Sequence, residues 1–393
     1  KFINAIFNHQ AKINEENAKN SDKLPFAASE IKTIWKQGIK HIQKFDKRFN
    51  KHLETNQSWY LVLDDRHLNN AKNIGIFDFL GSNIFKNKNN NDDTDNNNNN
   101  NNNNKTPLLS WHFLNSSILL HTGLLDTDSD SDNTAWNELL TLISSQGKNN
   151  LKGVIFSIDI QILQDLQNIL EENANKHNDK QNLTKLSQAM RERLNTLMLA
   201  INKNIPVYYV CNGLENIEGF TDWLNRLPND VLNEIYLGML NNNVNNKNFH
   251  ENSSKFFGVK DKNNDINNVN TENSTNNTNL FTANNLIHNL QNFIRKVIDK
   301  NALEGMYPRG DDLMLIIKLE KIIKNLFLLF DFTFAENKNL ISPNLRGSFF
   351  CACEQNYNKN GKVAFLNAFV NNLLNKEPDL REDLNTKNSF KAT

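Results

Sequence analysis

The chain has 393 residues, long enough for two or three domains, and its 44 basic and 44 acidic residues give a formal net charge of zero. No global electrostatic field therefore favours nucleic acid or an anionic membrane as a partner. Its three cysteines, Cys211, Cys351 and Cys353, lack the spacing of a disulfide framework, which indicates a reducing cytosol and core thiols rather than a metal or redox pair.

No segment is continuously apolar over the roughly 18 to 20 residues that a membrane span needs. The richest window, Leu315–Phe334, carries five charged residues and is therefore expected to be an amphipathic core helix. The chain opens KFINAIFNHQ, without a methionine or the apolar region of a signal peptide. We therefore expect it to be part of a longer protein.

Residues 1–57 are predicted to form a helical arm. Apolar residues recur there at spacings of three and four, which places them on one stripe of a helix. The stripe consists of Ile31, Ile34, Trp35, Ile39, Ile42 and Phe45. The face between these positions is rich in lysine and is expected to be solvated, with a lipid-headgroup or partner surface as the alternative.

Residues 58–240 are predicted to form an α/β domain, a mostly parallel sheet with helices on both faces, because short apolar segments alternate with helical ones. The predicted strand segments are Trp59–Leu63, Ser116–Leu125, Leu151–Ile160 and Ile205–Cys211, and the predicted helices are Thr134–Ser144 and Leu183–Ile201. Asp159, near the end of the third strand, is expected to cap the helix that follows.

Two asparagine-rich stretches, 87–105 and 241–279, interrupt this pattern. They cannot bury enough apolar surface to offset the entropy lost on ordering. We therefore predict that both are disordered insertions, around which the ordered fold closes.

The remainder of the chain is predicted to supply a helical extension and the end of the sheet. Residues 280–340 are expected to form a subdomain of two packed helices, Leu286–Ile298 and Asp311–Phe334. Residues 341–376 then add a final strand and helix to the α/β domain. Residues 377–393 are expected to form a linker towards a membrane span.

The first strand leads into a loop in the position of a nucleotide phosphate-binding loop. Such a loop needs glycines, whose backbone N–H groups close on phosphate oxygens, and a Lys and a Ser/Thr for the phosphates and Mg²⁺. Here the loop reads DDRHLNNAKN, without glycine. Two carboxylates, Asp64 and Asp65, followed by Arg66 and His67, stand where the anionic phosphate would lie.

The positions expected to bind Mg²⁺ and a nucleotide base have also changed. A strand is expected to end at Leu120, and His121 follows it, before Thr122 and Gly123. An Asp that binds Mg²⁺ would be expected at the position of His121. Imidazole is a poor ligand for this ion. In the base-reading loop, Asn212 replaces a Lys, and Glu215 could imitate the Asp. We therefore expect no catalytic residue, no metal and no cofactor; weak nucleotide binding without hydrolysis remains open.

Five sequence blocks in a fixed order carry a family resemblance. They are SWYLVL, WHFLNSSILLHTGLL, TAWNELLTLISSQGKNNLKGVIFSIDIQIL, RERL with NIPVYYVCNGLENIEGFTDWL, and LRGSFFCACEQN. Together, over Ser58 to Glu354, they resemble the cytoplasmic domain of the IcmF/TssM family, large inner-membrane proteins of type VI secretion systems, with type IVB relatives. In lacking these nucleotide motifs the chain resembles family members without Walker motifs, either Francisella-like or type IVB IcmF-like.

The resemblance implies a degenerate P-loop GTPase-like fold on the cytoplasmic face of the bacterial inner membrane. Two membrane spans would precede Lys1 and a third would follow the last helix. It also implies a structural role: with TssL-like and TssJ-like partners, and as a homo-oligomer in the full-length complex, the protein would dock the baseplate and contractile tail.

Two other functions are considered. The first is a regulatory switch that binds GTP or ATP through an altered loop. The second is an enzyme with a doubly wound fold, which the sequence disfavours because no set of nucleophile, base and oxyanion donors is visible. His67 and His121 are expected near the crevice where such sheets bind ligands.

Overall fold

The computed structural model describes residues 26–48, 57–64, 108–114, 117–164, 177–227, 229–241, 281–303, 309–334, 343–353 and 363–384. Among these residues, no helix combines the length and apolar character needed to cross a membrane. The predictions for the chain before residue 26, for the loop 65–107 with its insertion, and for the insertion 242–279 fall outside the described ranges.

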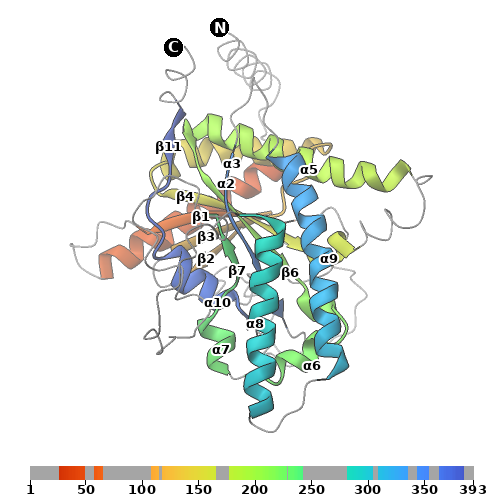
Figure 1. Ribbon diagram of the computed structural model, residues 1–393. Coiled ribbons are helices and arrows are strands. Elements are labelled where there is room, and N and C mark those ends of the chain that lie inside the picture. The colour runs from red at the N-terminus through yellow and green to blue at the C-terminus, as the bar shows by residue number, and fades with distance from the viewer. Residues whose placement is uncertain are drawn as a thin grey trace, which may run out of the picture.

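Seven of the described strands form one mixed sheet in the order β2-β3-β1-β4-β6-β8-β7 (Figure 1). The strands are β1 (Ser58–Asp64), β2 (Ser110–Phe113), β3 (Ser117–Thr122), β4 (Leu151–Asp159), β6 (Pro206–Asn212), β7 (Leu237–Leu240) and β8 (Asn344–Phe350). The inner five pair in parallel, and β2 and β7 pair antiparallel at the two edges. The predicted mostly parallel sheet is confirmed.

Helices surround this sheet (Figure 1). They are α2 (Phe26–Arg48), α3 (Asp130–Leu142), α5 (His177–Ile201), α6 (Phe220–Leu224), α7 (Asn229–Glu234), α8 (Ala283–Leu303), α9 (Gly310–Thr333) and α10 (Leu366–Ala368). Single π-helical turns, η3 (Ile143–Gly147) and η6 (Phe369–Leu374), continue α3 and α10, and η4 (Leu214–Asn216) is a 3-10 turn. The helices predicted at 286–298 and 311–334 correspond to α8 and α9.

Side chains of β1 alternate between two hydrophobic layers. Trp59, Leu61 and Leu63 join a large core with residues of α2, α3, α5, α8 and α9. Tyr60 and Val62 point to the opposite face, into a smaller core with α10 and η6. Helices therefore cover both faces, which explains why the inner strands are continuously apolar.

Local capping sets where α3 and α9 begin. The Ser129 side chain accepts a hydrogen bond from the Asp132 backbone N–H, so α3 starts four residues before the predicted Thr134. At α9, an Asp312 carboxylate oxygen accepts from the Arg309 backbone N–H at 3.0 Å. The same carboxylate is paired with Arg226 of the segment after α6, which ties α9 to that segment.

A cluster of three tryptophans joins α2 to the sheet. Trp35 of α2, Trp59 of β1 and Trp111 of β2 meet edge to face, with ring centroids 5.2–5.9 Å apart. Gly38, one turn after Trp35, allows α2 to approach Trp111 because a Cβ atom at this position would lie only 2.2 Å from that ring. The predicted apolar stripe of the arm therefore packs on the sheet through Ile31 and Trp35, both buried.

The segment 375–384 crosses the sheet at the amino end of its parallel strands. Its Glu377 carboxylate forms two 3.0 Å hydrogen bonds with the Arg346 guanidinium of β8, and both side chains are only 2% exposed. Further along, Asp379 pairs with Lys152 at 2.6 Å, and Arg381 donates to the Asn149 carbonyl at 2.8 Å. We call this segment the strap.

Two short strand pairs hold the strap and the segment that begins α10. The strand β11 (Glu382–Asp383) pairs antiparallel with β5 (Lys203–Asn204), and β10 (Val363–Ala364) pairs with β9 (Ala352–Cys353). Residues 377–384, the beginning of the stretch expected to form a linker, are thus held against the sheet.

Replacing Gly38 by alanine should destabilise the protein. In an ordinary helix this change stabilises by about 0.5–1 kcal/mol, but here the added methyl group would overlap Trp111. Overpacking of this kind costs about 1–3 kcal/mol. Urea unfolding measures the difference, with the exposed Lys36→Ala in the same helix as the control; a gain in stability for Gly38→Ala would refute the proposed packing.

Replacing Glu377 by alanine should cost about 3–5 kcal/mol, because it removes the carboxylate from the buried Arg346 guanidinium. The matched control is Lys152→Ala, which removes the lysine from Asp379 of the same strap; the Asp379 side chain is 43% exposed and keeps its bonds to Arg381. Solvent screens this second pair, so its loss should change stability by no more than about 1 kcal/mol. Equal effects in urea unfolding would show that the buried pair does not hold the strap.

Candidate functional site

The strand order places β1 at the centre of a topological switch. The chain leaves β1 to pair with β3 on one side and then crosses to β4 on the other. In open parallel sheets, ligands bind outside the carboxyl ends of the strands at such a point. The side chains that end these strands therefore form the candidate site.

Asp64 and His121 meet directly at this point. The Asp64 Oδ2 and His121 Nε2 atoms are 2.5 Å apart, and the side chains are 3% and 1% exposed. The strand β3 does not end at Leu120 as expected, because His121 and Thr122 continue its pairing with Val62 and Leu63 of β1. His121 is thus an interior strand residue whose ring faces a carboxylate.

Two side chains of β2 enclose the Asp64–His121 pair. The His112 ring lies 5.6 Å from the His121 ring, and His112 Nε2 is 3.2 Å from the Ser110 Oγ atom. Both β2 residues are buried. The carboxylate therefore faces a packed polar cluster rather than an open crevice.

The loop after β6, predicted to correspond to a base-reading loop, also directs its polar groups inward. Asn212 donates from Nδ2 to the Ser157 hydroxyl at the end of β4, at 3.0 Å. The Glu215 carboxylate accepts from the Cys353 backbone N–H, also at 3.0 Å, and burial raises the pKa of this carboxyl against the opposing effect of that bond. Glu215 therefore fastens the loop after β6 to β9.

The loop after β3 is held by Arg193 of α5. Its Nε and Nη2 atoms donate to the carbonyls of Leu124 and Asp126, at 2.8 and 2.7 Å. The guanidinium also lies over the Trp136 ring of α3, and burial lowers the pKa of Arg193. Gly123, buried at the start of this loop, accepts at its carbonyl from the Leu125 N–H.

Residues 129–387, about two thirds of the chain, match the family described as the IcmF-related N-terminal domain. The chain belongs to the IcmF-related family. No curated protein and no solved structure matches it. The family resemblance is confirmed, with three of its five sequence blocks inside the matched range and the first two before it. Membership associates the chain with bacterial secretion systems and with the inner membrane.

The structure of this IcmF-related protein describes only some of the predicted site residues, and Asp64, His121 and Gly123 precede the matched range 129–387. Asp64, His121, Gly123, Asn212 and Glu215 lie along the ends of β1, β3 and β6. Of these, Asp64 and His121 are in contact, whereas Asn212 and Glu215 bind to different neighbours. The positions Asp65, Arg66 and His67 lie outside the described residues.

The cysteines and Asp159 of the IcmF-related domain have structural roles and do not form a binding site. The free thiols of Cys211, Cys351 and Cys353 are buried, and burial raises the pKa of Cys211 and Cys351. Within the described ranges, no three His, Cys, Asp or Glu side chains are grouped as metal ligands. Asp159 accepts from the Gln161 backbone N–H at 2.9 Å, as its predicted capping role requires.

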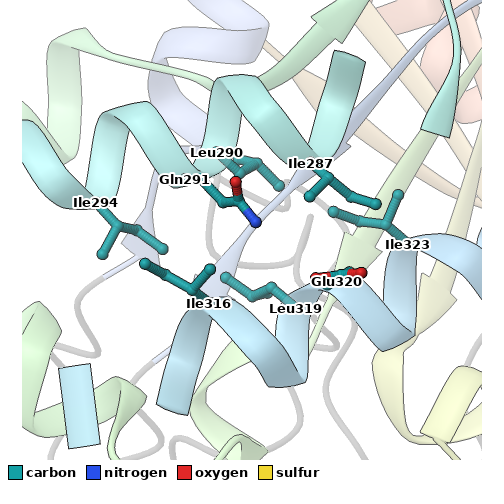
Figure 2. A pocket seen from close by; sticks show the side chains of 8 residues that line it. All are labelled: Ile287, Leu290, Gln291, Ile294, Ile316, Leu319, Glu320 and Ile323. Atoms are coloured by element: carbon teal, nitrogen blue, oxygen red, sulfur yellow. The ribbon is translucent and has the colours of Figure 1, made fainter. Parts of the chain in front are cut away.

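A shallow gap lies between α8 and α9, without room for a water molecule. Figure 2 shows aliphatic side chains of the two helices facing one another across it, with Gln291 above its centre. The lining side chains are Ile287, Leu290, Gln291, Ile294, Ile316, Leu319, Glu320 and Ile323. The gap therefore offers no space for a small-molecule ligand and is the junction of two packed helices.

Sequence reasoning missed the most highly connected charged residues. Arg193 stands within a block that carries the family resemblance, but the sequence gives no sign of its bonds to a loop 67 to 69 positions away. Arg346 and Glu377 likewise become partners only through the fold. The one available signal is that Arg193 and Arg346 each follow or precede a leucine of an apolar segment, where a charge requires a partner.

Replacing His121 by leucine should destabilise the domain by about 3–5 kcal/mol, because it takes the imidazole from the buried Asp64 carboxylate. Replacing both residues by leucine should recover part of this loss, since no charge is then buried. The control is Asp128→Ala, an exposed carboxylate in the loop after β3. Urea unfolding of all variants tests the pair; a loss below about 1 kcal/mol for His121→Leu would contradict it.

Proposed function

We propose that this domain is a pseudo-NTPase scaffold in a type VI-like secretion-system membrane complex. It docks the baseplate and tail on one side and TssL-like and TssJ-like membrane components on the other. It acts at the cytoplasmic face of the inner membrane, as part of a homo-oligomer in the full-length complex, and it does not hydrolyse nucleotides. The observation that carries this proposal is the buried Asp64–His121 pair at the topological switch point.

The pair occupies the place where phosphate and Mg²⁺ chemistry would require different groups. Phosphate oxygens need N–H donors, and a carboxylate at the end of β1 repels them. Mg²⁺ needs hard oxygen ligands, whereas His121 supplies a nitrogen that already faces Asp64. Asp64 disfavours the phosphate and His121 disfavours the Mg²⁺ of the same nucleotide complex. Together they support the loss of nucleotide chemistry.

The bonds of the neighbouring loops favour a scaffold over a regulatory switch. A switch needs a loop that is ordered by the terminal phosphate and released after hydrolysis. Here Arg193 donates to the carbonyls of Leu124 and Asp126, and Glu215 is bound to the backbone of β9, so both loops are held by the protein's own side chains. These contacts supply internally the order that a nucleotide would supply in a switch.

Nucleotide binding gives the direct test. A ligand present at one hundred times its Kd adds about 2.7 kcal/mol of stability and would raise the melting temperature measurably. With Mg²⁺ and millimolar GTP or ATP, we expect no rise above that seen with Mg²⁺ alone. A GTPase of known affinity serves as the positive control in the same assay. A saturable rise would refute the nucleotide-free scaffold and favour the alternative, a GTP- or ATP-binding switch.

A further inference from the structure

The outer face of α9 exposes large apolar side chains in a regular row. Met314, Ile317, Leu328 and Phe332 are 40–48% exposed, although they belong to a helix whose opposite side is fully packed. Two exposed lysines, Lys321 and Lys324, lie between the apolar pairs. We call these six residues the α9 seam. Figure 1 shows α9 as a long helix along one side of the molecule, next to α8.

The spacing of the seam is that of a helix-pairing surface. Its positions are separated by three or four residues throughout, which places them on one face of the helix. The first five follow the alternating spacing of a heptad seam, in which the side chains of one helix enter holes on another. From Met314 to Phe332 the seam extends for about 27 Å, at 1.5 Å per residue.

The apolar character of this face distinguishes α9 from the helix beside it. Its packed side directs Ile316, Leu319 and Ile323 towards α8, as Figure 2 shows, so these residues do not contribute to the seam. On the neighbouring helix α8, the exposed positions include His288, Arg295, Lys296 and Asp299. The outer face of α8 is thus polar, whereas that of the adjacent α9 is partly apolar.

The charges along α9 select among the possible partners. Two α9 helices related by a two-fold axis through the centre of the seam would place lysines against lysines, which is unfavourable. An anionic lipid surface would attract these lysines but would repel Asp311 and Asp331, which are exposed near the two ends of the helix. A protein helix with carboxylates at its centre satisfies both constraints.

We propose that the α9 seam binds an amphipathic helix of another protein, with apolar side chains towards both ends and Asp or Glu at the centre. Met314 and Ile317 would contact one apolar end, and Leu328 and Phe332 the other. Lys321 would pair with the central carboxylates, and so would Lys324, which would share its charge with Glu320, its 2.7 Å partner in the same helix. These pairs would set the register of the two helices. This proposal rests on the scaffold function proposed above and specifies the chemistry of one docking surface.

The test uses the whole 393-residue chain and two fluorescent peptides of about three heptads. Both carry leucine at the a and d positions, except at two central positions, which are glutamate in one peptide and lysine in the other. Fluorescence anisotropy should show that the glutamate peptide binds at least about tenfold more tightly. The double variant Lys321→Glu/Lys324→Glu should reverse this preference, and Ile317→Asp/Leu328→Asp should abolish binding of both peptides.

The matched control is Arg295→Glu/Lys296→Glu, which makes the same change of charge on the outer face of α8 and should leave binding unchanged. Absence of binding by either peptide, or equal binding of both, would overturn the proposal. Self-association of the chain that Ile317→Asp/Leu328→Asp abolishes would identify a second copy as the occupant instead. Binding to phosphatidylglycerol vesicles lost in the same variant would identify a lipid surface.

The peptide assay is independent of the nucleotide assay. A rise in melting temperature with GTP or ATP would refute the proposed function but would leave the peptide preference intact. Loss of the peptide preference without a nucleotide effect would remove this docking surface and leave the scaffold role standing.

Discussion

Burial of the parallel sheet on both faces is the constraint on which the rest of the fold depends. The side chains of β1 alternate between a core with α2, α3, α5, α8 and α9 and a second core with α10 and η6. The second cover comes from a segment more than 300 residues further along the chain. It is held in place at the amino ends of the parallel strands, where Arg346 and Glu377 form a buried ion pair. One long-range pair thus completes the layer that the central strands require.

The same burial shapes the carboxyl ends of the strands. A polar side chain enclosed there must find its partner within the protein, because water does not reach it. Asp64 has His121, Asn212 has Ser157, and Glu215 has a backbone N–H of β9. In a working nucleotide site, donors and carboxylates at these positions would be directed towards the ligand. Here they connect strands and loops to one another, so the region of the fold usually used for chemistry contributes to cohesion.

Sequence patterns were informative where burial is continuous and periodic. The apolar segments of β1, β4 and β6 and the long helices α8 and α9 could be predicted for this reason. The edge strands β2 and β7 could not, since each has four residues and gains its order from a neighbour. The pairing of His121 was also missed, because its polar side chain is stabilised inside the sheet by Asp64 of another strand. The roles of Arg193 and Glu377 depend on long-range contacts, which no local pattern encodes.

The strap gives the fold a graded response to mechanical tension. Tension applied at residue 384 would first meet the two-residue pairing of β11 with β5, then the partly exposed bonds of Arg381 and Asp379. The buried pair of Glu377 with Arg346 comes last and is the least accessible to water. The contacts of β11, Arg381 and Asp379 would therefore break and re-form while α10 and η6 stay packed on the sheet. In a complex that transmits load, such an arrangement separates brief extension of the chain from unfolding of the domain.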